Sequence, residues 1–142
     1  MRSAIVRDPI DASALLAEVS RRGNGATLLF LGTVRDMNDG RAVSGMEYTA
    51  YEEMAERELG RIVCEAVARC ASEDIVVEHR IGALHLGEVS VAIAVAHAHR
   101  APAYDASRYI IEEIKKRLPV WKREAYLDGS RAWVRTEGAS RE

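Results

Sequence analysis

Apolar positions recur along this chain with two different periods, and segments of one kind alternate with segments of the other. Spacings of three and four residues, typical of a helix with one buried face, predict helices over three segments: 12–19, 51–70 and 101–118. Shorter apolar or alternating runs bounded by turn residues predict strands over seven segments: 4–7, 26–35, 43–50, 75–81, 89–98, 120–127 and 131–134. This order of elements predicts a mixed α/β fold.

Two of the predicted strands are apolar on both faces. The stretch 91–96 within strand 89–98 has no polar residue, which is typical of a strand at the centre of a sheet that is covered on both sides. The run 26–35 is similarly apolar and predicts a second buried strand. The turn signal Asn38-Asp39-Gly40 follows it, so we expect 43–50 to return as its partner strand. The segment 82–88 contains two glycines and is expected to be a connection.

A rigid corner is predicted where the last helix meets the following strand. Pro119 has no N–H and restricts the residue before it to extended backbone, so the helix must end near Leu118. Alternation along strand 120–127 then places Lys122 and Glu124 on one face and Arg123 on the other. Lys115 lies at the border of the helix's apolar face. The pattern leaves open whether Lys115 and Lys122 are solvated or form an anion site.

Composition and charge set limits on the partners of the chain. With 142 residues, the chain is predicted to form one domain, 1–142, with a polar tail from about residue 136. Lys and Arg (20) nearly balance Asp and Glu (22), which argues against a general nucleic-acid binder. The sequence has neither a membrane-spanning apolar run nor a signal-peptide pattern, so we expect no membrane association and a cytoplasmic location.

Motifs for metal or cofactor binding are not found. Cys64 and Cys70 lie in one predicted helix, too far apart to pair, and are expected to be buried thiols. No histidine is paired with a cysteine at ligand spacing, so we expect neither a metal nor a resident cofactor. His79, in mid-strand, is expected to be structural.

Basic side chains follow several predicted strand and helix ends. Arg35 ends one strand, His99 and Arg100 follow the central strand, and Lys115 and Lys122 flank the proline corner, whereas Lys116 and Arg117 are expected to be solvated. We hypothesise that the sheet brings these ends into one positive pocket for a small anion such as a phosphate ester. Crowding by other cations would lower the pKa of a lysine there and suit it to acid–base or covalent chemistry. The residues alone thus indicate an α/β domain with an anion pocket.

Five motifs, in this order, resemble one known family. They are Phe30-x-Gly32-x-Val34-Arg35-x-x-Asn38-x-Gly40, Glu47-Tyr48-x-x-Tyr51, His79-Arg80-Ile81-Gly82-x-Leu84-x-x-Gly87-Glu88, His99-Arg100-x-x-Ala103 and Lys115-x-x-x-Pro119-x-Trp121-Lys122-Arg123-Glu124. Together they span about residues 26–133 and resemble the MoaE family, the large catalytic subunits of molybdopterin synthase.

The resemblance implies a fold, partners and a reaction. The fold is an α/β hammerhead-type domain with an additional small antiparallel β-sheet. The implied assembly is a homodimer in which each subunit binds a small ubiquitin-like sulfur carrier (MoaD-like), giving a heterotetramer. Sulfur passes from the carrier's C-terminal Gly-Gly thiocarboxylate to cyclic pyranopterin monophosphate and forms the dithiolene of molybdopterin.

The resemblance also implies roles for individual residues. Lys115 and Lys122 are the catalytic candidates, and the implied substrate contacts are Thr33, Val34, Arg35, His99, Arg100, Lys115, Lys122, Arg123 and Glu124. Two alternatives stay open at this point: a non-catalytic module that binds a phosphate ligand or a partner, and a phosphoesterase that uses His99 as its acid.

Overall fold

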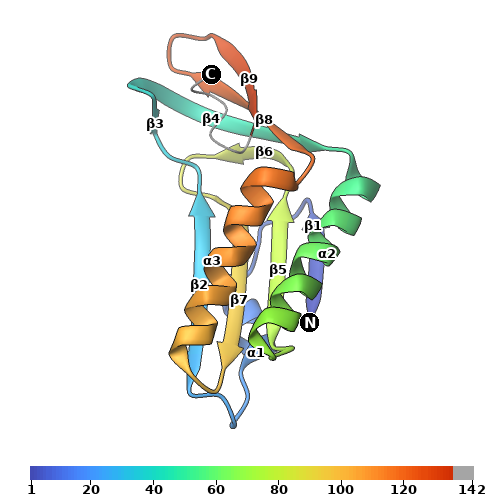
Figure 1. The fold of residues 1–142 in the computed structure, drawn as a ribbon. Coiled ribbons are helices and arrows are strands. Elements are labelled where there is room, and N and C mark those ends of the chain that lie inside the picture. The colour runs from blue at the N-terminus through green and yellow to red at the C-terminus, as the bar shows by residue number, and fades with distance from the viewer. Residues whose placement is uncertain (136–142) are drawn as a thin grey trace.

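Two β-sheets and three helices make up the part of the chain that the computed structural model describes, residues 1–135 (Figure 1). In chain order the elements are β1 (Arg2–Val6), α1 (Ala12–Val19), β2 (Ala26–Thr33), β3 (Met37–Asn38), β4 (Arg41–Ala50), α2 (Glu52–Cys70), β5 (Ile75–Arg80), β6 (Gly82–His85), β7 (Val89–His97), α3 (Arg100–Arg117), β8 (Val120–Tyr126) and β9 (Arg131–Arg135). The tail expected from about residue 136 lies outside the described residues. No helix within residues 1–135 is long and apolar enough to cross a membrane.

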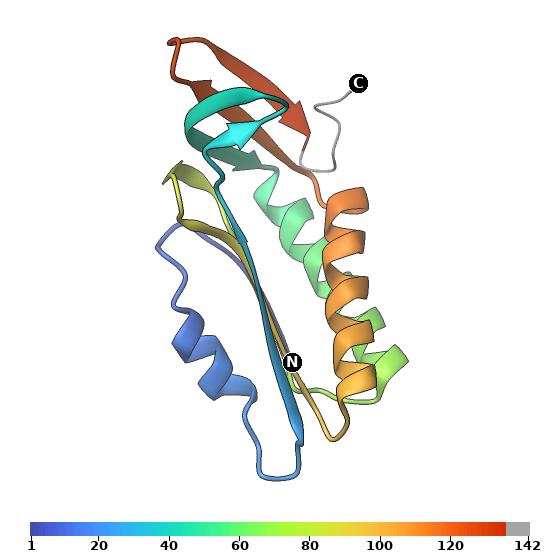
Figure 2. The same cartoon turned by 90° about the vertical axis from the view of Figure 1, so that its left-hand side faces the viewer.

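The larger sheet has the strand order β1-β5-β7-β2. β1 runs parallel to β5, and the other neighbours are antiparallel. Helices α2 and α3 cover one face and the short helix α1 covers the other (Figure 2). β7 therefore lies between two strands and two helical layers, and its residues 90–96 are all buried, which confirms the prediction of a central strand.

The main core lies between this sheet and the paired helices. The helix residues that are fully or almost fully buried in it are Ala55, Leu59, Ile62, Val63, Ala66, Ala103, Ala106, Ile110 and Ile114. On the opposite face, Leu15 and Val19 of α1 pack against alanines of β7. The N-terminal cap predicted for α1 is also present, since the Asp11 carboxylate accepts a hydrogen bond from the Ala14 N–H.

The expectation of a buried strand over 26–35 is wrong. β2 is an edge strand, paired with β7 on one side, and Phe30 and Leu31 are 37% and 38% exposed. An apolar run shows that a strand can be buried, but burial also needs neighbours on both sides, and these are set by tertiary pairing. β2 consequently presents apolar side chains and an open hydrogen-bonding edge on the surface of this chain.

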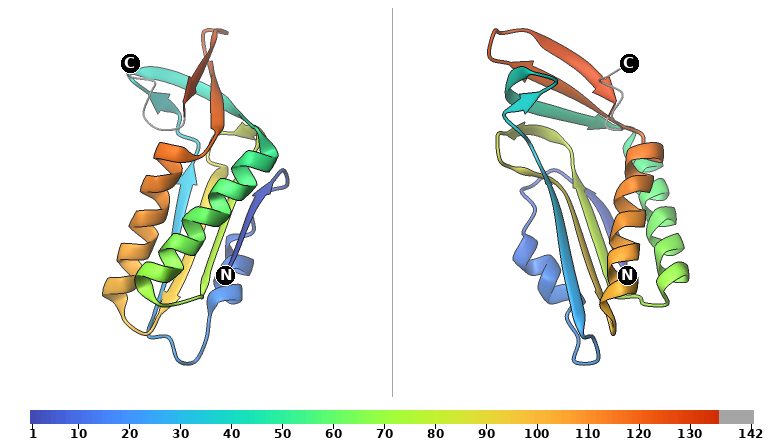
Figure 3. Two further views of the ribbon diagram at one scale, coloured as in Figure 1. Left: turned by 45° about the vertical axis from the view of Figure 1, so that its right-hand side comes forward. Right: turned by 60° about the vertical axis from the view of Figure 1, so that its left-hand side comes forward.

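The smaller sheet forms around β4, which pairs with β3, β6 and β8, while β9 pairs with β8. This corrects two expectations: 43–50 does not pair with 26–35, and the segment 82–88 contains strand β6. Asp39 and Gly40 both have positive φ, 50° and 79°, so the predicted turn is present, but it joins β4 to the two-residue strand β3. Figure 3 shows this sheet standing at one end of the larger sheet, beside the C-terminal end of α3. The architecture is the expected α/β domain with an additional antiparallel sheet.

Arg117 is not a solvated helix end, as the sequence had suggested, but an ion-pair partner that ties α3 to α2. Its guanidinium lies 2.6 Å from Glu58 and 2.7 Å from Glu65 of α2, and 3.0 Å from Glu113 of its own helix. Hydrogen bonds from Arg117 and, to a smaller extent, from Tyr109 lower the pKa of Glu65 to about 2. The next residue back, Lys116, is the solvated one, with a 3.6 Å ion pair to Glu113.

We predict that Arg117→Met lowers the free energy of unfolding by about 1 kcal/mol, the upper end of the range for exposed ion pairs. Carboxyl groups with a lowered pKa in the folded state stabilise it above their ordinary pKa, and that contribution is lost as the pH falls through the folded value. The difference between wild type and variant should therefore be full at pH 7 and shrink between about pH 4.5 and about pH 2. Urea unfolding across this range measures it. Lys116→Met is the matched control, and an equal loss there would contradict the assignment.

Candidate active site

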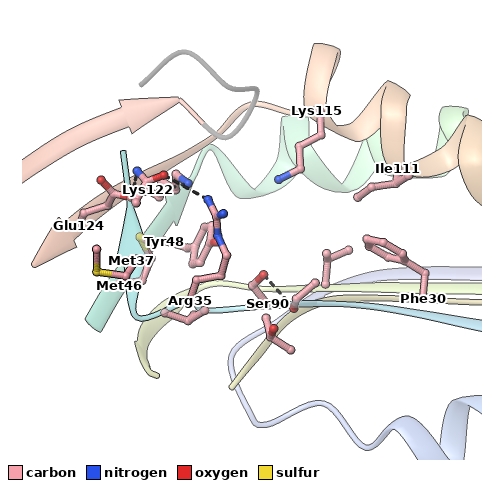
Figure 4. A pocket seen from close by; sticks show the side chains of 15 residues that line it. Phe30, Arg35, Met37, Met46, Tyr48, Ser90, Ile111, Lys115, Lys122 and Glu124 are labelled. Carbon is pink, nitrogen blue, oxygen red and sulfur yellow. Dashed lines mark hydrogen bonds and ion pairs between the residues drawn. The ribbon is translucent and has the colours of Figure 1, made fainter. Parts of the chain in front are cut away.

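A cavity of about 130 Å³ lies where the end of the larger sheet, the smaller sheet and the last turns of α3 meet (Figure 4). Its lining comes from five strands, one helix and the link after β2: Phe30, Gly32, Thr33, Val34, Arg35, Met37, Asn38, Met46, Tyr48, Ser90, Val91, Ile111, Lys115, Lys122 and Glu124. The structure thus brings together most of the residues that the sequence had singled out.

The path of β2 brings the chain into this cavity. The register of β2 against β7 shifts between Gly32 and Thr33, and β2 ends at Thr33 after one more pairing, with Val89. A Cβ atom added to Gly32 would lie 2.7 Å from Cγ1 of Val91, and the two strands can approach this closely because residue 32 has no side chain. The chain then crosses from one sheet to the other through the cavity wall.

Backbone hydrogen bonds hold the crossing segment in place. The Val34 N–H donates to the Glu88 carbonyl at 3.0 Å, and the Val34 carbonyl accepts from the Gly87 N–H at 2.9 Å. Val34 itself is buried, 4% exposed, against Met46. The Arg35 side chain that follows extends into the cavity (Figure 4).

The proline corner delivers the two lysines from the other side. α3 ends at Arg117, and Leu118 is extended (ψ 125°), as the following Pro119 requires. Lys115 is therefore on the last turn of the helix, and Lys122 is on β8 after the corner. The alternation predicted for β8 is confirmed, because Glu124 is 1% exposed on the inner face of the strand while Arg123 lies on the outer face.

The amine of Lys115 lies inside the cavity although much of the residue is exposed (Figure 4). Partial burial lowers the pKa of this amine, and the positive charges of Lys122 and Arg35 lower it further. The neutral fraction of Lys115 consequently rises at a lower pH than for an ordinary lysine. Such an amine can accept a proton or act as a nucleophile closer to neutral pH.

Glu124 is a buried carboxylate that balances part of this positive charge. Its Oε1 accepts from the Tyr126 hydroxyl at 2.5 Å, and its Oε2 accepts from the side-chain amide of Asn38 at 2.5 Å. The Lys122 amine lies 3.9 Å from Oε2. The hydrogen bond to Glu124, with burial, raises the pKa of Tyr126. Charge-neutral donors thus occupy both oxygens of the carboxylate.

Sequence reasoning treated Asn38 as a turn residue and missed its place in the site. Its amide contacts both Glu124 and Arg35, with Oδ1 accepting from Arg35 Nη2 at 3.2 Å. The spacing Arg35-x-x-Asn38 was the available signal, but nothing local indicates that the side chain points toward β8.

A histidine behind the cavity is structural, as expected. His79 is 3% exposed, its Nδ1 bonds the Arg80 carbonyl at 3.0 Å, and its ring packs edge-on against Tyr48. Burial lowers the pKa of His79 to about 4, so it stays neutral under physiological conditions.

His99 and Arg100 do not lie in this cavity, which corrects the hypothesis of a single pocket within one chain. They stand at the start of α3, about 22 Å from Lys115 at the usual helical rise of about 1.5 Å per residue. The reason is topological: α3 starts at one end of the larger sheet and runs back along it, so its two ends face opposite ends of the domain. The His99 N–H instead donates to Nδ1 of His97 at 2.9 Å.

Arg123 also lies outside the cavity. It forms an ion pair with Glu47 on the neighbouring strand β4 and stacks over the Trp133 ring at 5.0 Å. The period of two along β8 causes this, since consecutive residues point to opposite faces.

Neither cysteine reaches the site. Cys70 is buried, but Cys64 is exposed on α2, so the expectation of two buried thiols is wrong for Cys64. Helical periodicity places position 64 beside the buried stripe and not within it. No group of three or more His, Cys, Asp or Glu suitable for a metal occurs in the described part of the chain.

We predict that NMR titration of the Lys115 amine gives a pKa below the ordinary value of 10.5. In Lys122→Met the pKa should rise toward the ordinary value, because removal of a neighbouring positive charge favours the protonated amine. Lys116→Met, which alters a solvated amine on the same helix, should leave the pKa of Lys115 unchanged. A wild-type value at or above 10.5 would contradict the electrostatic account of the cavity.

Comparison with known proteins identifies the family of the chain. The family model described as MoaE protein matches residues 5–117. A molybdopterin synthase catalytic subunit from Bacillus subtilis is 39% identical over 133 residues, which are 94% of this chain and 84% of that protein. The crystal structure of molybdopterin synthase from Staphylococcus aureus has a TM-score of 0.82 and 35% identity, covering 92% of this chain and 94% of that one. A complex of subunits 1 and 2 of the molybdopterin-converting factor from Helicobacter pylori shares the fold, with a TM-score of 0.72 and 22% identity over 92% of this chain and 88% of that one. The chain therefore belongs to the MoaE family, whose curated members include molybdopterin synthase catalytic subunits.

Proposed function

We propose that this chain transfers sulfur from the thiocarboxylated C-terminus of a small ubiquitin-like carrier to cyclic pyranopterin monophosphate. The product is the dithiolene of molybdopterin, a step in molybdenum cofactor biosynthesis, and the expected compartment is the cytoplasm. The observation that carries the proposal is the convergence of Lys115 and Lys122 on one cavity from two rigid elements, with Arg35 opposite them.

The charge of the cavity suits both reactants. Arg35, Lys115 and Lys122 are the basic side chains of the described lining, and Glu124 is the acidic one. A phosphate ester and a thiocarboxylate are both anions, so each gains from this excess of positive charge. Arginine offers two parallel donors to phosphate oxygens, while a lysine amine can move a proton.

The sulfur must come from outside the cavity lining. Both cysteine thiols lie elsewhere. The sulfur atoms in the lining belong to the thioethers of Met37 and Met46, and a thioether sulfur is bonded to two carbons and cannot be donated to the substrate. A carrier that ends in Gly-Gly suits such a site, because a chain without side chains can enter a narrow cavity.

An open groove gives the carrier tail a route to Lys115. This groove, of about 770 Å³, lies between β2 and α3 and shares Phe30 and Ile111 with the cavity. The complex of two converting-factor subunits from Helicobacter pylori, which has the same fold, supports assembly with a small partner subunit.

The two lysines are assigned complementary roles. The amine of Lys115, whose pKa is lowered by burial and by the neighbouring cations, is placed to shuttle protons or to attack the carbonyl carbon of the thiocarboxylate. Lys122, close to Glu124, would hold the phosphate or stabilise the negative charge that develops on oxygen as sulfur leaves. The same geometry is compatible with exchanged roles, in which Lys122 moves the proton or attacks the carbonyl carbon and Lys115 holds the phosphate.

A homodimer would explain how His99 and Arg100 can contact substrate although they lie far from the cavity of their own chain. The resemblance implies that His99 and Arg100 contact substrate, yet they lie at the far end of α3 within one chain. Both statements hold if these residues serve the cavity of a second copy. The apolar, open edge of β2 is a surface that association can cover, and one carrier per subunit would complete a heterotetramer.

We predict that Lys115→Ala and Lys122→Ala each lower the rate of dithiolene formation by at least ~10²-fold. Groups that act mainly in the transition state affect turnover far more than binding, so affinity for the carrier should stay near that of wild type. The assay mixes this chain with a thiocarboxylated carrier and the pterin precursor and measures dithiolene product.

Controls separate this proposal from its alternatives. Lys116→Ala should be nearly silent, and equal damage there would show a general charge effect. A carrier without its terminal glycines should give no product. A non-catalytic binding module would bind the pterin without product, and a phosphoesterase would release phosphate in the absence of a carrier.

A mixing experiment tests the dimer. Arg100→Ala and Lys115→Ala should each be inactive alone, but subunit exchange between them should restore roughly a quarter of wild-type activity, because half the dimers are mixed and one of their two sites is intact. No recovery after demonstrated exchange would place both residues in the same site and contradict the shared-site arrangement.

A further inference from the structure

Asn38 is the last residue before the Asp39-Gly40 turn, yet its side chain does not build that turn. The turn is made by the positive φ angles of Asp39 and Gly40. The carboxamide of Asn38 instead lies between a cation and an anion of the site: Oδ1 accepts from Arg35 Nη2 at 3.2 Å, and Nδ2 donates to Glu124 Oε2 at 2.5 Å.

The two contacts require one orientation of the amide. If the amide were turned over, its NH2 group would face the guanidinium and its oxygen would face the carboxylate, giving two repulsions in place of two hydrogen bonds. Asn38 thus offers Arg35 an acceptor that carries no charge, and it offers Glu124 a donor that carries no charge.

A direct pair between Arg35 and Glu124 would have a different consequence. Guanidinium and carboxylate groups favour a bidentate ion pair, and Glu124 is a buried carboxylate at this side of the cavity. Such a pair would neutralise Arg35 and draw it toward β8. The amide of Asn38 stands between the two groups and bonds to both.

We propose that Asn38 is a positioning residue that holds Arg35 toward the cavity and keeps its positive charge available to an anionic substrate. The proposal rests on the anion-binding role proposed above. It adds a residue to the site and explains why a neutral amide separates the arginine from the carboxylate.

The structure offers a matched comparison in Tyr126. Tyr126 donates to the other oxygen of Glu124, and among the described residues no hydrogen bond joins Tyr126 to Arg35. If Asn38 served only to satisfy the buried carboxylate, loss of either donor would have the same kind of effect. If Asn38 acts on Arg35, the two losses differ.

The test uses sulfate as a divalent anion whose charge does not change with pH in the working range. Its binding is followed by the NMR signal of Arg35 Nε–H in the wild type and in Asn38→Asp, Asn38→Ser and Tyr126→Phe, with thermal unfolding of each variant as the check on folding. Asn38→Asp keeps the size of the side chain but places a carboxylate against both Arg35 and Glu124. Repulsion from Glu124 favours contact of the new carboxylate with Arg35, so sulfate affinity should fall by about tenfold or more. Asn38→Ser should weaken binding less, and Tyr126→Phe should stay within about twofold of wild type.

Each outcome decides the proposal. Equal sulfate affinity in wild type and the folded Asn38 variants, an equal loss in Tyr126→Phe, or no sulfate binding to the wild type would overturn it. If Asn38→Asp does not fold, the difference between Asn38→Ser and Tyr126→Phe decides.

Turnover provides a second measurement that a purely structural role would not produce. With the carrier present, Asn38→Asp should raise the KM for the pterin phosphate more than it lowers kcat, because a neutralised guanidinium weakens ground-state and transition-state binding alike. If the wild type forms no dithiolene while sulfate binding follows the expected order, the proposed function fails and the role of Asn38 stands. If the wild type forms dithiolene and Asn38→Asp matches it in sulfate affinity and in the KM for the pterin phosphate, the proposed function stands and the role of Asn38 fails.

Discussion

The turn at Leu118-Pro119 determines how the two halves of this protein meet. α3 packs on the larger sheet, and β8, which begins one residue after the proline, belongs to the smaller sheet. Because Pro119 has a restricted φ and forces the preceding residue into extended backbone, the helix and the strand join at a defined angle. The cavity lies at this junction. Its lysines are therefore carried by regular elements and held in position before any ligand arrives.

The electrostatics of the cavity follow from that geometry. Three basic side chains share a small, partly buried space, and burial together with the charges of Lys122 and Arg35 lowers the pKa of Lys115. Glu124 offsets part of the charge, but its two oxygens are occupied by Asn38 and Tyr126. The site consequently keeps an excess of positive charge, which destabilises the unliganded protein slightly and favours a bound anion. Sites in which function opposes stability in this way are common in enzymes.

Local patterns identified most of the site but could not show which of these residues meet in one cavity. The alternation along β8 correctly placed Lys122 and Glu124 on one face and Arg123 on the other, but it left open whether Lys115 and Lys122 are solvated or line a site. His99 and Arg100 were included because they follow the central strand, and the resemblance added Arg123. Neither a position after a strand nor a motif position gives the distance to the cavity. An 18-residue helix separates His99 from the cavity, and the period of a strand turns Arg123 away from it. Both facts are geometric consequences of elements that the sequence had already predicted.

The sequence by itself determined the three helices and seven of the nine strands of residues 1–135, in their order, because the periods of 3.6 and 2 residues and the Pro and Gly positions act over a few neighbouring residues. The all-apolar centre of β7 was also sufficient to predict its burial. Tertiary structure alone decided that β2 is an edge strand, that β6 pairs with β4, that Arg117 joins two helices, and that Asn38 bridges Arg35 and Glu124. Each of these depends on a partner far along the chain, or on the lack of one, and local patterns carry no information about which distant segments meet.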